Sequence, residues 1–202
     1  MRKVAAAAGL AGPLLFAVVV LTLTLAQYRF MRSLGWDPIL RPTFDWPSGL
    51  SLGPLGWVMT GTFLISGVLM SAFALGLRKE LQNRTGQIGS ILMVWAGVAM
   101  MGLAFTTDPT ASPNPIMPVT WHGRLHDLSF LALGLLLIPA MILYAITFRE
   151  IDRWKRLSRL TWVTSALAIP TFALKGIIFY AFLVTMLAWN EAAALNLWNI
   201  SS

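Results

Sequence analysis

Residues 125–147 read LHDLSFLALGLLLIPAMILYAIT, and this stretch decides the class of fold. With a helical rise of about 1.5 Å per residue, it is long enough to cross the ~30 Å hydrocarbon core of a bilayer. Its ionisable side chains, His126 and Asp127, stand at one end. The composition of the whole chain agrees, because 57% of the residues are apolar and 11% are charged, whereas soluble domains have about 45–50% and about 25%. We therefore predict an all-α integral membrane protein.

Four other apolar runs lie before and after this stretch. Each exceeds the roughly 20 residues that a spanning helix needs, and they cover about residues 4–27, 55–77, 87–107 and 161–189. We predict a single membrane domain over residues 1–202, with five visible transmembrane helices. The first run is longer than the apolar part of a cleaved signal peptide, which has about 7–15 residues. We therefore predict that it is retained as a helix.

Basic residues are divided unequally between the two ends of these predicted helices. By the positive-inside rule, the side with more lysine and arginine is cytoplasmic, which places the N-terminus inside and makes 28–54 and 108–124 outer loops. The positive charges fall in short blocks between apolar runs, so we interpret the net charge of +7 as setting orientation and not as a nucleic-acid surface. The inner residues are Arg2, Lys3, Arg78, Lys79, Arg84, Arg149, Arg153, Lys155, Arg156 and Arg159, and the outer ones are Arg29, Arg32, Arg41 and Arg124.

Tryptophans and rigid loops mark the predicted membrane surfaces. Amphipathic rings favour the interface, and we expect this anchoring role for Trp57, Trp121, Trp162 and Trp189, which fall at predicted helix ends. The outer segments 36–54 and 108–118 are rich in proline, which breaks helices and stiffens loops. Two interpretations of these loops stay open, a lid over a site and a cap over helix ends.

The only two histidines of the chain stand four residues apart, in the sequence WHGRLHD of residues 121–127. On a helix both imidazoles then project from one face, and they can bind one divalent ion if a third ligand comes from elsewhere. Asp108 ends the preceding apolar run, so we predict a metal site formed by Asp108, His122 and His126. Asp127 lies about 100° from His126 around an ideal helix, where it can transfer a proton or orient an imidazole.

Two other interpretations of this cluster stay open. One is a metal-free polar or proton-handling site. The other is structural, because Asp127 in the first turn of a helix complements the helix dipole. Haem is not expected, since two histidines on one face of one helix cannot ligate one iron from opposite sides. The chain has no cysteine, which excludes disulfides and thiolate metal sites.

Lys175 is predicted near the middle of the last apolar run. It is thirteen residues from Trp162 and fourteen from Trp189, which corresponds to about 20 Å from either membrane surface. A charged group at this depth is costly and usually functional. Three roles stay open for Lys175: it is neutral, it binds backbone carbonyls freed by Pro170, or it faces a lipid head or a partner subunit.

Several strings of this sequence resemble a known family. They are SLGPLGWVM at 51–59, FLISG at 63–67, ALGLR at 74–78, FTTDP at 105–109 and HGRLHD at 122–127. They resemble the bacterial domain-of-unknown-function 998 family, over about residues 5–150. The resemblance implies a six-helix bacterial membrane protein of unestablished activity, with Ser48, Asp108, His122 and His126 as its functional set. Because residues 190–202 are too short and polar for a sixth span, the chain is either truncated or needs a partner.

Two functions from different classes follow. In the first, the protein hydrolyses or modifies a lipid-borne bond at its outer face, and Asp108, His122 and His126 hold a divalent metal such as zinc that activates water. Ser48 or Asp127 would then donate or accept a proton. These residue types are similar to those of the zinc-dependent alkaline ceramidase and adiponectin-receptor superfamily, an analogy only.

The second function is that of a non-catalytic accessory subunit in a larger membrane complex. Under both readings we expect membrane lipids as partners, a partner membrane subunit under the second, and no nucleic acid. The expected location is the bacterial inner membrane, with several spans.

Overall fold

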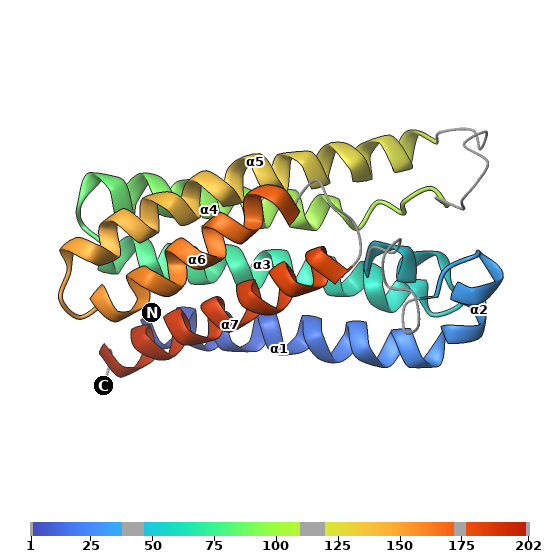
Figure 1. Cartoon of the computed structure of the whole chain (residues 1–202), viewed down its shortest axis with the longest axis horizontal. Coiled ribbons are helices and arrows are strands. Elements are labelled where there is room, and N and C mark those ends of the chain that lie inside the picture. Colours follow the sequence, from blue (N-terminus) through green and yellow to red (C-terminus); the bar gives the residue numbers. More distant parts are fainter. Residues whose placement is uncertain (1, 38–46, 110–119, 172–176, 201–202) are drawn as a thin grey trace.

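The computed structural model describes residues 2–37, 47–109, 120–171 and 177–200, and this part of the chain consists of helices and their connections, with no strand. Figure 1 shows the helices lying along one common axis. They are α1 (Arg2–Ala26), α2 (Tyr28–Ser33), the 3-10 helix η1 (Pro47–Leu52), α3 (Gly56–Glu80), α4 (Arg84–Gly102), α5 (Trp121–Glu150), α6 (Lys155–Thr171) and α7 (Ile177–Ile200). The predicted all-α class is confirmed.

The six long helices form a ring in which each contacts its two neighbours, in the order α1, α3, α4, α5, α6, α7 and back to α1. Chain direction alternates around this ring (Figure 1). We call the end that holds Arg2, Glu80 and Ile200 the terminal end, and the end that holds α2, η1 and the start of α5 the loop end. The ten basic residues that we predicted on the inner side all lie near the terminal end.

Four helices of the described chain, α1, α3, α4 and α5, are long and apolar enough to cross a membrane. Their outward faces are apolar as well, and large exposed apolar surfaces are uncommon on soluble monomers. The exposed side chains include Leu14, Leu21, Leu64, Ile65, Val68, Leu131 and Leu135. Length, composition and exterior therefore fit a lipid environment.

The helix predicted over 161–189 is wrong as a single element, because the chain forms α6 and α7 instead. The Trp189 Nε1–H donates to Thr161 Oγ1 at 2.9 Å, and the Asn196 side chain donates to the Arg153 carbonyl at 3.2 Å. Residues 28 positions apart on one straight helix would be about 42 Å apart, so these bonds require two antiparallel helices. Pro170 in the last turn of α6 removes a backbone donor and favours helix termination.

This pairing also corrects the role of Trp189. We expected its ring at the membrane surface, but Trp189 is fully buried inside the bundle. Its position looked like a helix end only because the last apolar run was read as one helix. Trp57 and Trp121 are exposed at the loop end, which fits their expected position.

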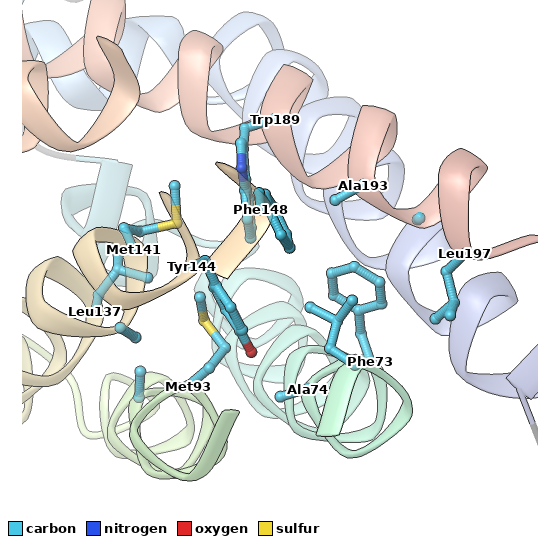
Figure 2. Close-up of a cluster of buried hydrophobic side chains, with 14 of the residues drawn as sticks. Phe73, Ala74, Met93, Leu137, Met141, Tyr144, Phe148, Trp189, Ala193 and Leu197 are labelled. Carbon is cyan, nitrogen blue, oxygen red and sulfur yellow. The ribbon is translucent and has the colours of Figure 1, made fainter. Parts of the chain in front are cut away.

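The terminal half of the bundle is filled by large side chains (Figure 2). Tyr144 of α5 stacks on Phe148 and on Trp189, with ring centroids 5.6 and 6.0 Å apart, and Phe148 stacks on Trp154 at 4.7 Å. All four rings are fully buried. The Tyr144 hydroxyl donates to Ser90 Oγ of α4 at 3.2 Å. Aromatic packing therefore joins α5, the α5–α6 connection and α7, and the Tyr144 hydroxyl adds a hydrogen bond to α4.

Two further contacts hold this half together. The Glu80 side chain is fully buried and forms ion pairs with Arg2, at 3.2 Å, and with Arg153. It thereby links α1, α3 and the chain just before α6. At Gly67 and Gly97 the backbones of α3 and α4 approach so closely that a Cβ at either position would meet the backbone of the other, as is typical of helices packed in membranes.

Candidate functional site

The loop end contains a polar network that connects the end of α4 to the start of α5. Asp108 accepts two hydrogen bonds from Thr120, one from its backbone N–H at 2.9 Å and one from its hydroxyl at 2.6 Å. Thr120 is the N-cap of α5, because its Oγ1 accepts from the Gly123 N–H at 3.1 Å. Gly123 is required here, since a Cβ at this position would overlap the Asp108 carboxylate.

The charge of Asp108 is stabilised by this arrangement. The hydrogen bond from the Thr120 hydroxyl holds the pKa of the Asp108 carboxyl below its usual value, against a smaller opposing effect of desolvation. The backbone N–H of Thr120 and the nearby imidazoles of His122 and His126 lower it further. Asp108 is therefore a carboxylate at neutral pH, anchored at the N-terminus of α5, where negative charge is favourable.

His122 extends the network to the chain after α4. Its Nδ1 lies 3.0 Å from the Thr106 carbonyl oxygen and 2.9 Å from Thr120 Oγ1. A carbonyl oxygen can only accept, so Nδ1 carries the proton and Nε2 is the remaining ring nitrogen. Through Thr120, the structure thus brings Asp108 and His122 together as the sequence pattern suggested.

His126 lies one turn further along α5 and is buried. Its Nδ1 lies 2.7 Å from the Phe105 carbonyl and 3.1 Å from the Leu103 carbonyl. Both carbonyls belong to the residues that follow α4, where carbonyl groups lack helical partners. The bond fixes the tautomer, which leaves Nε2 of a neutral His126 as a hydrogen-bond acceptor or base.

The predicted metal site can be compared with this geometry. Among the described residues, no group of three or more His, Asp or Glu side chains is arranged to hold a metal ion. The Nδ1 atoms of both histidines are engaged with backbone carbonyls, so a shared ion would have to bind their Nε2 atoms. The metal role of Asp108, His122 and His126 stays a prediction, while their hydrogen bonds show that they join the two helices.

A cavity of about 150 Å³ lies inside the loop half of the ring. It is bounded by α1, η1, α3, α4, α5 and α7, and none of the described residues of α6 lines it. Most of its wall is apolar, and the polar residues on it are Ser48, Ser66, His126 and Asn190. The apolar lining includes Phe16, Phe63, Met70, Met100, Leu103, Phe130, Leu133, Leu137, Phe179, Phe182, Leu183 and Met186.

The other predicted site residues have different positions. Ser48 lies in η1, is half-buried, and lines the same cavity as His126. Asp127 is exposed on α5 and does not line the cavity. Lys175 lies outside the described residues. The structure therefore brings Ser48 and His126 to one cavity. His122 lies one turn before His126 on α5, and Asp108 is bonded to the N-cap of this helix.

Three parts of this site were missed from the sequence. Thr120 could have been found, because a threonine just before an apolar helix is an N-cap signal. Ser66 and the wall contributed by α7 gave no comparable signal. Serine is common in packed membrane helices, and the α7 wall depends on separating two helices within one apolar run.

The chain belongs to a family of proteins of unknown function, DUF998, whose model matches residues 10–196. The match covers nearly the whole chain, including α7, and confirms the resemblance found in the first 150 residues. No curated protein and no solved structure matches the chain.

Proposed function

We propose that this protein is a multi-pass membrane protein that binds an amphiphile from the surrounding bilayer. The apolar chain of the ligand occupies the cavity, and its polar end lies against His126 and Ser48. The observation that carries the proposal is the cavity itself, which is apolar along its wall and has a buried histidine at its loop end. Ligand sites combine these two features, a mostly apolar wall and a few placed polar groups.

The length of the cavity supports a single chain as the occupant. On α5 the lining runs from His126 to Leu137, and on α7 it runs from Phe179 to Asn190. Eleven residues of helix cover about 16 Å, which is about half of the ~30 Å hydrocarbon core. The cavity therefore matches the depth of one leaflet. With the N-terminus in the cytoplasm, as the basic residues predict, this is the outer leaflet of the inner membrane.

The arrangement of α6 and α7 supports the same proposal. Figure 1 shows α1 and α5 continuing toward the loop end beyond α6 and α7. With 17 residues α6 is the shortest member of the ring, and α5 with 30 is the longest. All six helices therefore take part in the ring in the terminal half. The cavity lies in the loop half, where no described residue of α6 forms part of the wall.

A second candidate function is modification of the bound lipid, favoured by the presence of Ser48 and His126 on one cavity. A hydroxyl and an imidazole are the residue types of a nucleophile and its base, and the Nδ1–H bond to the backbone leaves His126 Nε2 free to accept a proton. In a metal-dependent form of this reaction, the Nε2 atoms of His122 and His126 and the carboxylate of Asp108 would hold the metal ion. The accessory-subunit reading predicts neither a bound lipid nor a product.

The test of binding compares two variants of α5. Leu133 lines the cavity, whereas Leu135 is 66% exposed on the outward face. We expect native mass spectrometry to find one retained lipid per protein in the parent and in Leu135→Trp, and none in Leu133→Trp, because the larger indole would project into the cavity and obstruct the acyl chain. Equal lipid retention by the two variants, or none in the parent, would refute the proposal.

The test of modification follows the lipids of nanodiscs that contain the protein. A product that appears with the parent and disappears with Ser48→Ala and with His126→Gln supports an enzyme. Both variants should still retain lipid if the chain occupies the cavity. A parent that binds lipid but leaves its composition unchanged would leave binding alone as the function.

A further inference from the structure

Ser66 differs from the other buried hydroxyl residues of the helices. It lies in α3 and is 4% exposed, and its hydroxyl has no hydrogen-bond partner among the described residues. Buried hydroxyls in helices commonly donate to the carbonyl four residues before them. Five others among the described residues do so, namely Thr62, Ser90, Thr161, Thr164 and Ser165. Ser66 therefore carries an uncompensated polar group in the interior.

Ser66 lines the cavity, so a ligand in the cavity can accept a hydrogen bond from its hydroxyl. Two other polar residues of the cavity already form hydrogen bonds to backbone carbonyls outside it. Asn190 donates its side-chain N–H to the Gly9 carbonyl at 3.2 Å, and His126 Nδ1 is bonded to the chain after α4. A buried hydroxyl without a partner is destabilising, so a ligand that bonds to Ser66 would remove this cost.

The depth of Ser66 can be placed relative to His126. The rings of Phe63 and His126 pack edge to face, with centroids 6.4 Å apart. Ser66 lies three residues beyond Phe63 on α3, in the direction of the terminal end, which corresponds to about 4.5 Å along the helix axis. Ser66 and His126 therefore line one cavity at different levels along the helix axis, with Ser66 nearer the terminal end.

We propose that the ligand is an acyl ester. The Ser66 hydroxyl donates a hydrogen bond to the ester carbonyl, which lies next to the polar end of the ligand on the side of the terminal end. This inference rests on the proposed function, with the polar end at His126 and Ser48 and the acyl chain below Ser66 among Met70, Phe182 and Met186. An ester amphiphile has this order of groups: a polar end, then a carbonyl acceptor, then a hydrocarbon chain. A plain alkyl chain would leave Ser66 unbonded.

The experiment uses two probes that differ at one group. A pyrene-labelled monoacylglycerol and its alkyl-ether analogue, which lacks the carbonyl, are titrated into nanodiscs that contain the full chain. We expect the parent to bind the ester about five- to tenfold more tightly than the ether, as the loss of one buried hydrogen bond predicts. In Ser66→Ala the two affinities should be equal, and Ser66→Thr, which keeps a hydroxyl, should retain the preference.

Ser90→Ala is the matched control, because Ser90 is a fully buried serine of the neighbouring helix α4 that does not line the cavity. It should keep the ester preference but lower the Tm, since Ser90 bonds to the Gly86 carbonyl and to Tyr144. Ser66→Ala should not lower the Tm of the ligand-free protein, since no hydrogen bond is lost.

The outcomes separate this inference from the function on which it rests. If neither probe binds the parent, the proposed lipid binding fails. If both bind the parent with equal affinity, or if Ser66→Ala keeps the ester preference, the cavity binds lipid but the bond from Ser66 to an ester carbonyl is refuted.

Discussion

The terminal half of this bundle is built from all six long helices, whereas none of the described residues of α6 lines the cavity of the loop half. In the terminal half, Tyr144, Phe148, Trp154 and Trp189 stack in one closely packed core. The Tyr144 hydroxyl and the Trp189 N–H have hydrogen-bond partners there, whereas the Trp154 N–H has none among the described residues. In the loop half, a cavity lies between the helices and the hydroxyl of Ser66 has no partner. We therefore expect the packing to stabilise the protein mainly in the terminal half, and we propose ligand binding for the loop half.

The largest expected effect breaks the packed half. Phe148→Ala should lower the free energy of unfolding by about 3 kcal/mol, because it leaves a void between Tyr144 and Trp154. Phe182→Ala should lower the free energy of unfolding less than Phe148→Ala, because the Phe182 ring already borders a cavity. Reversible unfolding in mixed micelles measures both. Equal losses would show that the two halves are packed alike.

The next effect concerns the contact between α3 and α4. Gly97→Val should destabilise the protein by about 2 kcal/mol, since its side chain would meet Ser71 and the Gly67 backbone. Gly61→Ala on α3 is the control, because a Cβ at that position meets nothing within 4 Å. The same unfolding assay should find Gly61→Ala unchanged or slightly more stable. If Gly97→Val were tolerated equally well, the close approach of the helices would not matter.

The smallest effect is expected at the loop end. The pKa of Asp108 is lowered in the folded protein, so its contribution to stability is present above the unfolded value of about 3.9. This contribution is lost as the pH falls through the folded pKa. Acidification from pH 6 to pH 3 should therefore lower the Tm of the parent by roughly 1–2 °C more than that of Asp108→Asn. Identical pH profiles would show that the Asp108–Thr120 bonds do not stabilise the helix junction.

The sequence predicted the first four long helices well but not the last two. The apolar runs of the first four helices are bounded by charged residues or prolines, which mark the helix ends clearly. Residues 161–189 lack such a boundary, and Pro170 alone is not decisive. Pro13 and Pro139 lie inside α1 and α5 without ending them, because proline is tolerated in membrane helices.

Some residues of the candidate site could be predicted from the sequence, but its geometry could not. The spacing of His122 and His126 placed both on one helix face, and Asp108 lies beside them through Thr120. The Nδ1 atoms of both histidines bond to backbone carbonyls of the residues that follow α4. These bonds depend on how α4 and α5 pack, which the sequence pattern does not specify. The missing hydrogen bond of Ser66 depends on tertiary structure in the same way, so no pattern in the chain reveals it.

The central claim, that the cavity binds the chain of a membrane lipid, is tested most directly by photo-crosslinking. Nanodiscs with the full chain and a diazirine-labelled acyl lipid are irradiated, and adducts on α5 are mapped by peptide mass spectrometry. The inward face of α5 carries Phe130, Leu133 and Leu137, and its outward face carries exposed Leu128, Leu131 and Leu135. We predict adducts on the inward residues that excess unlabelled lipid removes. Adducts confined to the outward residues would contradict the claim.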